Sequence, residues 1–236
     1  MGPEQAAGDE GELAVLVAAR NEADRIGAPV SALPPVRVPG ARVWVADDAS
    51  EDGTAEAAMA AGAEVVSRGR PHGKGANVSA AAEAALSVPD PPRLVLLCDG
   101  DLGASAARLA PLVEAVRRGE CDLAVAAFSR RVGGGFGLAL GFARWAIRRR
   151  CGYEAGAPIS GQRAMRAEVL RAVLPFAPSY GMEIGMTVDA VRAGYELEEY
   201  ELDLEHRATG KSFAGFLHRA RQLRDFTRVY WSYGGR

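Results

Sequence analysis

Lysine, histidine and cysteine are all scarce in this sequence. Lys74 and Lys211 are the only lysines among 28 basic residues, and histidine and cysteine occur three times each. An odd number of cysteines without metal-ligand spacing predicts neither a disulfide framework nor a zinc site. The formal net charge of −2 gives no general attraction to nucleic acid. No run approaches the ~18 apolar residues that a membrane-spanning helix needs.

The composition is that of a globular domain. Hydrophobic residues make up 48% of the chain and charged residues 25%, which allows a sizeable core. Residues 1–12 are acidic and rich in glycine and alanine, and they lack the basic and apolar regions of a signal peptide. We expect them to form a short disordered leader before a single domain over residues 13–236. The cysteine content favours a reducing, cytoplasmic location.

The first half of the chain alternates apolar runs with alanine-rich helical windows. Thr54 is placed to cap a helix over Ala55–Ala61, and Ser105 is placed to cap one that runs to Arg118. This alternation predicts a Rossmann-like, doubly wound α/β sheet that is mostly parallel. The expected strands are short and mostly apolar, and they are Leu13–Ala19, Arg42–Ala46, Ala63–Ser67, Arg93–Cys98 and Asp122–Phe128.

The second half has a different pattern. Residues 130–141 are rich in glycine and predict a flexible loop, and a helix is expected over Met182–Ala193. The alternation slips within Tyr195–Leu204, which predicts a β-bulge or two successive strands, and a final helix is expected from Phe213. The segment Phe142–Cys151 is basic and amphipathic. It fits a solvated helix face or a peripheral contact with the inner face of the membrane.

Polar clusters follow three of the expected strands, at residues 20–22, 47–54 and 99–101. Ligands of open α/β sheets bind outside the carboxyl ends of the strands, so we expect these clusters to converge. In the third cluster Asp99 and Asp101 are separated by one glycine. Mg²⁺ and Mn²⁺ take oxygen ligands from a few carboxylates together with substrate phosphates, so this carboxylate pair is an expected metal site.

With these motifs the sequence resembles the family-2 glycosyltransferases, which are inverting nucleotide-sugar enzymes of GT-A fold and include the polyprenyl-phosphate sugar synthases. The resemblance covers roughly Leu13 to Ser212. It implies that Asp101 binds the metal and that Asp99 binds the ribose or supports the metal site. It implies a nucleotide-sugar-binding half over residues 13–128 and an acceptor-side half over residues 129–236. It also implies that a first group of residues binds the nucleotide-sugar, and these are Asn21, Glu22, Asp48, Lys74 and Asp99.

The resemblance extends to the acceptor side. Residues 160–166 resemble a Ser-Gly-x-x-Arg stretch, and residues 207–212 resemble an Arg-x-x-Gly-x-Ser segment of the polyprenyl-phosphate enzymes. Glu183 matches the start of a helix that carries an acidic residue towards the acceptor. The expected acceptor-binding residues are Gln162, Arg163, Arg207 and Lys211. The sequence departs from those relatives in having no membrane helices after this segment, which weakens the case for a lipid acceptor.

The expected reaction is metal-dependent, inverting transfer of a sugar from a nucleotide-diphosphate sugar. His206, just after an expected strand, either completes the metal site with Asp101 or is a polar residue at a strand end. For a hydroxyl acceptor Glu183 is the expected general base, whereas a phosphate acceptor depends on the basic acceptor-binding residues. The acceptor is a polyprenyl phosphate, a small phosphorylated metabolite or a glycan. The rival functions are a nucleotidyltransferase that makes nucleotide-sugars and an inactive nucleotide-sugar sensor.

Overall fold

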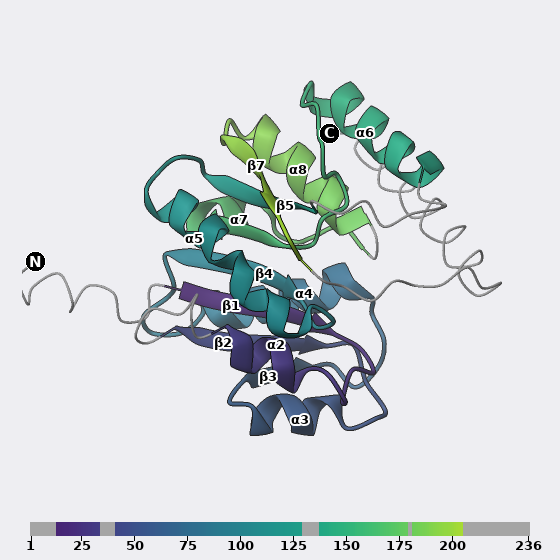
Figure 1. The fold of residues 1–236 in the computed structure, drawn as a ribbon, viewed down its shortest axis with the longest axis vertical. Helices are drawn as coiled ribbons and strands as arrows, with labels where there is room; N and C mark the ends of the chain where they lie inside the picture. The colour runs from purple at the N-terminus through teal and green to yellow at the C-terminus, as the bar shows by residue number, and fades with distance from the viewer. Residues whose placement is uncertain (1–12, 34–40, 129–136, 179–180, 205–236) are drawn as a thin grey trace, which may run out of the picture.

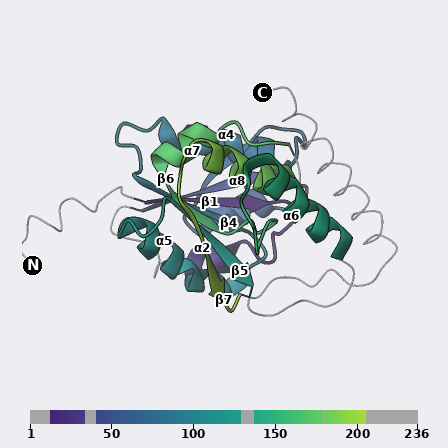
Figure 2. The same cartoon turned by 90° about the horizontal axis from the view of Figure 1, so that it is seen from above.

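The computed structural model describes residues 13–33, 41–128, 137–178 and 181–204. Within them, a seven-stranded sheet has helices on both faces (Figures 1 and 2). The strands are β1 (Leu13–Ala19), β2 (Arg42–Asp47), β3 (Glu64–Ser67), β4 (Leu94–Asp99), β5 (Leu123–Phe128), β6 (Arg163–Arg166) and β7 (Leu197–Leu202). The helices are α2 (Gly27–Ala32), α3 (Thr54–Ala60), α4 (Lys74–Leu86), the 3₁₀ helix η1 (Gly103–Leu109), α5 (Ala110–Arg117), α6 (Gly137–Cys151), α7 (Ala167–Val173) and α8 (Met182–Arg192).

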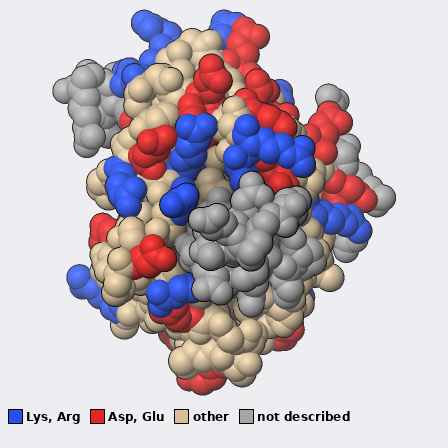
Figure 3. Space-filling view, turned by 90° about the vertical axis from the view of Figure 1, so that its left-hand side faces the viewer, with Lys and Arg blue, Asp and Glu red and all other residues tan. Residues whose placement is uncertain are grey.

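The strand order is β3-β2-β1-β4-β6-β5-β7. All neighbouring strands are parallel except β6, which runs antiparallel to both β4 and β5. The expected mostly parallel α/β sheet is therefore confirmed. The carboxyl ends of β2, β1 and β4 lie side by side on one side of the molecule. These strands begin on the opposite side, where basic and acidic side chains are mixed on the surface (Figure 3).

Two apolar cores fill the space between the sheet and its helices. In β1, Val15 and Val17 belong to one core and Leu16 belongs to the other, because successive side chains point to opposite faces. The first core packs against α2, α3, η1 and α5, and the second packs against α4, α7 and α8. A third cluster joins α6 to α8, through residues such as Ile147 and Val188. Burial on both faces explains why the inner parallel strands β1, β2 and β4 are mostly apolar, whereas the edge strands β3 and β7 are more polar.

The helix expected after Ser105 differs from the prediction. Ser105 lies inside η1, where its hydroxyl donates to the Leu102 carbonyl at 2.7 Å, and α5 begins only at Ala110. Pro111 stands in the first turn of α5. Proline lacks an N–H and clashes with the carbonyl four residues earlier, so one α-helix cannot run from Ser105 to Arg118. The start of α3 also differs from the prediction. Thr54, expected to cap this helix, is its first helical residue, and the capping position is taken by Gly53 with a φ of 83°.

The second half also differs in three places. Residues 137–141, expected in a flexible loop, form the start of α6. The segment Tyr195–Leu204 contains one strand, β7, which pairs with β5 at the edge of the sheet. The strand β6 was not expected, since it is only four residues long and begins and ends with arginine. The expected disordered leader and the helix from Phe213 lie outside the described residues.

Candidate active site

The carboxyl ends of β1 and β4 are held together by their backbones. The Gly100 N–H donates to the Ala18 carbonyl at 2.9 Å, directly after the last residue of β4. A Cβ added at Gly100 would lie 3.1 Å from that oxygen and 3.2 Å from Cδ1 of Ile26. Glycine between Asp99 and Asp101 therefore allows the turn after β4 to pass close to β1.

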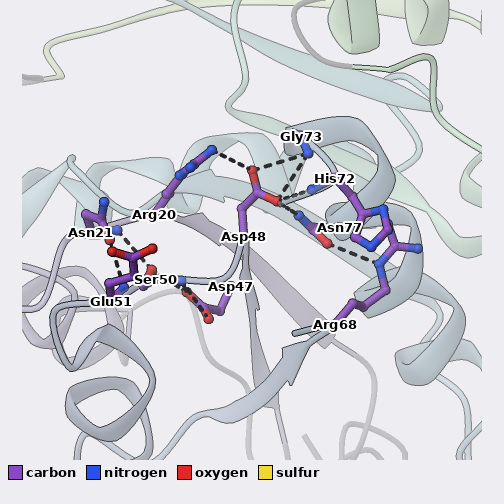
Figure 4. Close-up of polar contacts among 10 residues, drawn as sticks. All are labelled: Arg20, Asn21, Asp47, Asp48, Ser50, Glu51, Arg68, His72, Gly73 and Asn77. Carbon is purple, nitrogen blue, oxygen red and sulfur yellow. Dashed lines mark hydrogen bonds and ion pairs between the residues drawn. The ribbon is translucent and has the colours of Figure 1, made fainter. Parts of the chain in front are cut away.

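The loops after β1 and β2 are joined by hydrogen bonds. The Asn21 N–H donates to the Ser50 hydroxyl at 2.9 Å, and the Glu51 N–H donates to Oδ1 of Asn21 at 3.0 Å (Figure 4). The Glu22 N–H donates to the Thr54 hydroxyl at 2.9 Å. Asn21 adopts a φ of 53°, a left-handed conformation that asparagine tolerates better than most residues. Asn21 and Glu22 thus hold the loop after β1 against the loop after β2. Their expected contacts with the nucleotide stay predictions.

Asp48 connects this loop pair to the start of α4. Its Oδ1 accepts from the backbone N–H groups of His72 at 2.7 Å and Gly73 at 3.1 Å, and the Asn77 side-chain amide donates to the same atom (Figure 4). The Arg20 guanidinium lies 3.4 Å from Oδ2. Asp48 is 7% exposed. The carboxylate therefore fixes the turn that precedes Lys74, whereas the expected contact to a base or ribose remains a prediction.

Replacing Asp48 by alanine should release this turn. Two backbone N–H groups and the Asn77 amide lose their acceptor, so the free energy of unfolding should fall by about 1–3 kcal/mol. Nucleotide affinity should fall about ten- to hundredfold if the same carboxylate or the turn contacts the nucleoside. Urea unfolding and calorimetry with nucleoside diphosphates measure the two effects, with Asp24→Ala as the control, because the Asp24 side chain is 75% exposed. Unchanged stability together with unchanged affinity would contradict this assignment.

Four side chains from distant parts of the chain meet at the end of β4. We call them the Lys74 cluster, and they are Lys74, Asp99, Gln162 and Glu183. Nζ of Lys74 lies 2.7 Å from Oδ1 of Asp99 and 2.8 Å from Oε1 of Glu183. Nε2 of Gln162 donates to Oδ2 of Asp99 at 2.7 Å. These residues come from the start of α4, the end of β4, the loop before β6 and the first turn of α8. The structure therefore brings predicted donor-side and acceptor-side residues into direct contact.

The charges of the Lys74 cluster stabilise one another. Burial alone would lower the pKa of Lys74, but the attraction of Asp99 and Glu183 outweighs it and raises the pKa above its ordinary value. Lys74 is therefore a cation at neutral pH. The Glu183 side chain is 7% exposed and that of Lys74 is 28% exposed, so the pair is only partly screened by solvent.

Gly161 allows the loop before β6 to approach this cluster. A Cβ at this position would lie 2.6 Å from Nζ of Lys74 and 2.7 Å from Oδ2 of Asp99. Real Cβ atoms do not come so close, so any other residue would displace the Lys74 and Asp99 side chains or the loop itself. The Ser-Gly-x-x-Arg stretch identified in the sequence thus has a steric reason for its glycine. It places Gln162 against the carboxylate of Asp99.

Arg163 takes a different position from the one its predicted acceptor contact suggests. It is 1% exposed, and its Nε donates to the Ser160 carbonyl at 2.9 Å. Its Nη1 donates to the Thr187 hydroxyl on α8, also at 2.9 Å. Burial lowers the pKa of Arg163 to about 10, which leaves it charged at neutral pH. The side chain faces inward and ties β6 to the helix that carries Glu183.

Asp101 lies in the turn after β4 and is partly exposed. Both carboxylate oxygens of Asp99 face donors of the Lys74 cluster, so Asp101 is the better-placed carboxylate for a cation. In the described part of the chain, no three His, Cys, Asp or Glu residues gather in a metal-binding group. A donor set this small fits Mg²⁺ or Mn²⁺, whose remaining ligands are phosphate oxygens and water. The other predicted metal and acceptor ligands, His206, Arg207 and Lys211, lie outside the described residues.

A clamp at Glu199 was missed by the sequence reasoning. Its two carboxylate oxygens accept from the consecutive N–H groups of Gly156 at 2.9 Å and Ala157 at 2.8 Å. The Tyr153 hydroxyl also lies 3.4 Å from Oε1 of Glu199, and burial raises the pKa of this tyrosine. The clamp holds the loop that leads to Gly161. Nothing in the acidic run of β7 distinguishes Glu199 from its neighbours, so only the fold reveals it.

The basic helix α6 lies on the outside of α8 (Figure 2). Trp145 is 46% exposed, and Arg144 donates to the Gly156 carbonyl at 2.7 Å. Arg148 lies 3.9 Å from the exposed carboxylate of Glu154. No helix among the described residues has the length and apolar character needed to cross a bilayer. Contact of α6 with a membrane surface stays a prediction.

Solved structures of glucosyl-3-phosphoglycerate synthase from Mycobacterium tuberculosis resemble this one. The complex with phosphoglyceric acid has a TM-score of 0.77 and 27% identity, and the match covers 98% of this chain and 82% of that chain. The complex with Mn²⁺, UDP and phosphoglyceric acid has a TM-score of 0.78 and 27% identity, covering 98% and 81%. The complex with Mg²⁺ and UDP has a TM-score of 0.75 and 28% identity, also covering 98% and 81%.

One of the two sequence comparisons identifies a family. A comparison with curated proteins found no match. The sequence profile described as Glycosyl transferase family 2 matches residues 14–174, which is more than half of the chain. Together with the similar structures, this match confirms the GT-A fold and favours sugar transfer over the nucleotidyltransferase alternative. The chain is a glycosyltransferase and belongs to glycosyl transferase family 2.

Proposed function

We propose that this enzyme transfers glucose from UDP-glucose to the hydroxyl of a small phosphorylated acid of the glycerate type. The observation that carries the proposal is the Lys74 cluster, which joins the donor-side motif at Asp99 to the acceptor-side residues Gln162 and Glu183. The substrate classes come from the similar structures, which were solved with UDP-glucose and phosphoglyceric acid and with UDP and glucosyl-3-phosphoglycerate.

A divalent cation is part of this proposal. The similar structures were solved with Mn²⁺ or Mg²⁺ beside UDP, and Asp101 is the residue that we expect to hold the ion here. Such an ion supplies positive charge that stabilises the leaving diphosphate. Lys74 adds a fixed cation at the same edge of the sheet, held by Asp99 and Glu183. The loop at Gly161 keeps the acceptor side close to it.

Glu183 has two possible roles in this arrangement. As a general base, it would accept the proton of the attacking acceptor hydroxyl during an inverting displacement. As a positioning residue, it would hold Lys74 through the contact at 2.8 Å. The anomeric proton coupling of the product tests the base role, because only an inverting displacement requires a base opposite the leaving group. A retained configuration would assign Glu183 to holding Lys74.

The variant Glu183→Gln tests the base role directly. It keeps the side-chain volume but removes the basic carboxylate, so turnover should fall by about 10²–10⁴ while donor affinity is largely preserved. Steady-state kinetics and calorimetry with UDP-glucose measure these quantities. Glu201→Gln is the control, because Glu201 is exposed on β7. A loss smaller than tenfold would show that Glu183 is not the base. Acceptor binding by the basic residues Arg207 and Lys211 would then be the more important contribution to turnover.

An acceptor screen tests the proposed function. The full chain is incubated with UDP-glucose and Mn²⁺ together with 3-phosphoglycerate, a polyprenyl phosphate or an oligosaccharide, and UDP and glucosylated products are measured by mass spectrometry. We expect product with 3-phosphoglycerate. Product with polyprenyl phosphate alone would replace the glycerate proposal by the lipid acceptor and support a membrane role for α6. Release of pyrophosphate from UTP and glucose 1-phosphate would instead support the nucleotidyltransferase alternative.

A further inference from the structure

A cavity of about 480 Å³ lies on the face where the parallel strands begin, at the far end of β4 from Asp99. Figure 3 shows this face, with several basic side chains around a hollow and acidic side chains between them. Four arginines and one glutamate are the charged residues that line the cavity, and they are Arg93, Arg117, Arg166, Arg171 and Glu168. We call it the arginine cavity. Because β4 has six residues at about 3.3 Å each, roughly 20 Å separates it from the Lys74 cluster.

The fold fixes the backbone around the arginine cavity. Arg93 directly precedes β4, and its carbonyl accepts from the Ala167 N–H at 2.8 Å. Arg166 ends β6 and pairs in register with Leu94. Arg117 ends α5, and Arg171 lies in the last turn of α7. The guanidinium groups thus come from four elements of the fold rather than from one mobile loop.

The arginines differ in how far their charge is already neutralised. Arg117 is paired with Glu114, and Arg166 lies 3.2 Å from Asp122 and 3.6 Å from Glu168. Arg93 and Arg171 are exposed and have no carboxylate within ion-pair distance in the described ranges. Two guanidinium groups at the cavity therefore carry charge that no acidic side chain of the described structure offsets.

The remaining wall of the cavity is apolar. It includes Pro91, Pro92, Leu94 and Val116. A cleft lined mainly by one sign of charge, with apolar surface beside it, focuses the electric field on an anion. The volume lies within the range of about 300–1,000 Å³ that is usual for small-molecule sites. Guanidinium groups present a planar pair of donors that matches the oxygens of a phosphate.

From these features we infer that the arginine cavity is a second binding site, separate from the active site, for a small phosphorylated metabolite. Arg93 and Arg171 supply the charge that recognises the phosphate, and Arg166, fixed by Asp122, supplies a further donor. The apolar wall receives the carbon part of the ligand. The ligand is a soluble phosphate ester or diphosphate, because a volume of about 480 Å³ matches that of small-molecule sites.

Calorimetry with inorganic phosphate and pyrophosphate, on the full chain in EDTA, tests the inference. The wild type should bind at least pyrophosphate, and the double variant Arg93→Ser/Arg171→Ser should bind it about ten- to hundredfold more weakly. The matched control is Arg148→Ser/Arg149→Ser, which removes two exposed arginines of α6 and should bind like the wild type. Circular dichroism and melting temperature report whether each variant is folded.

Three results would overturn the inference. The first is that neither probe binds to the wild type. The second is equal affinity of the wild type and Arg93→Ser/Arg171→Ser, which would place the bound anion elsewhere, for example in the active site. The third is equal loss in the α6 control, which would show a general effect of net charge. If the double variant does not fold, Arg171→Glu replaces it, and retained binding in that variant counts against the site in the same way.

Discussion

The variant Asp101→Ala should bind UDP with an affinity that no longer depends on Mn²⁺ or Mg²⁺. Both oxygens of Asp99 face Lys74 and Gln162, and Asp101 is the second carboxylate of the turn after β4 and the expected metal ligand. A metal that bridges protein and diphosphate loses its protein anchor when Asp101 is removed. Sugar transfer should then fall by about 10³ or more, because several kcal/mol of charge stabilisation is lost.

Calorimetry with UDP in the presence of Mn²⁺ and in EDTA measures this directly. Asp90→Ala is the control, because Asp90 is an exposed carboxylate before β4, at the other end of the strand from the turn at Gly100. The melting temperature of Asp101→Ala in EDTA should match that of the wild type, since Asp101 lies in a partly exposed turn. A variant that still bound UDP more tightly with Mn²⁺ would show that other residues hold the ion.

The variant Lys74→Met should lose both activity and stability. It leaves the carboxylates of Asp99 and Glu183 without the cation that lies 2.7 Å and 2.8 Å from them. The free energy of unfolding should fall by about 1–3 kcal/mol, less than for a fully buried pair because Lys74 is partly exposed. Turnover should fall by about 10²–10³, since a fixed positive charge is lost where the leaving group gathers negative charge.

A double-mutant cycle separates the two effects. In Lys74→Met/Glu183→Gln the buried carboxylate of Glu183 is neutralised, so part of the lost stability should return. The activity should not return, because both functional groups are missing. Urea unfolding and steady-state kinetics on the two single variants and the double variant measure the coupling. Additive losses of stability would show that Lys74 and Glu183 do not interact energetically, contrary to the observed contact.

The sequence predicts the inner parallel strands β1, β2 and β4 well because they are buried on both faces. The runs ending at Ala19, Asp47 and Asp99 are almost wholly apolar, and this signal does not depend on the rest of the fold. The strand β6 carries no such signal, because its four residues include Arg163 and Arg166. Its strand conformation follows from pairing with β4 and β5, which is a property of the tertiary structure.

Part of the candidate site could also be predicted from local sequence, and part depends on the tertiary structure. Lys74, Asp99 and Glu183 were each selected from local motifs, but the contact between Lys74 and Glu183 joins residues 109 positions apart. No spacing rule connects them, so the cluster appears only when α4 and α8 are folded onto the sheet. Arg163 shows the opposite case, in which the motif drew attention to a residue whose side chain proves to be internal. The clamp at Glu199 has no sequence signal at all.

The antiparallel strand β6 also limits how this protein can be divided. Residues 163–166 come late in the chain, yet they occupy an inner position between β4 and β5. A fragment that ended at Phe128 would expose the backbone donors and acceptors of Leu94–Leu97, which pair with β6 in the intact sheet. Unpaired strands of this kind favour edge-to-edge aggregation. We therefore expect the donor-side and acceptor-side regions to unfold together in one cooperative transition, and neither to fold when expressed alone.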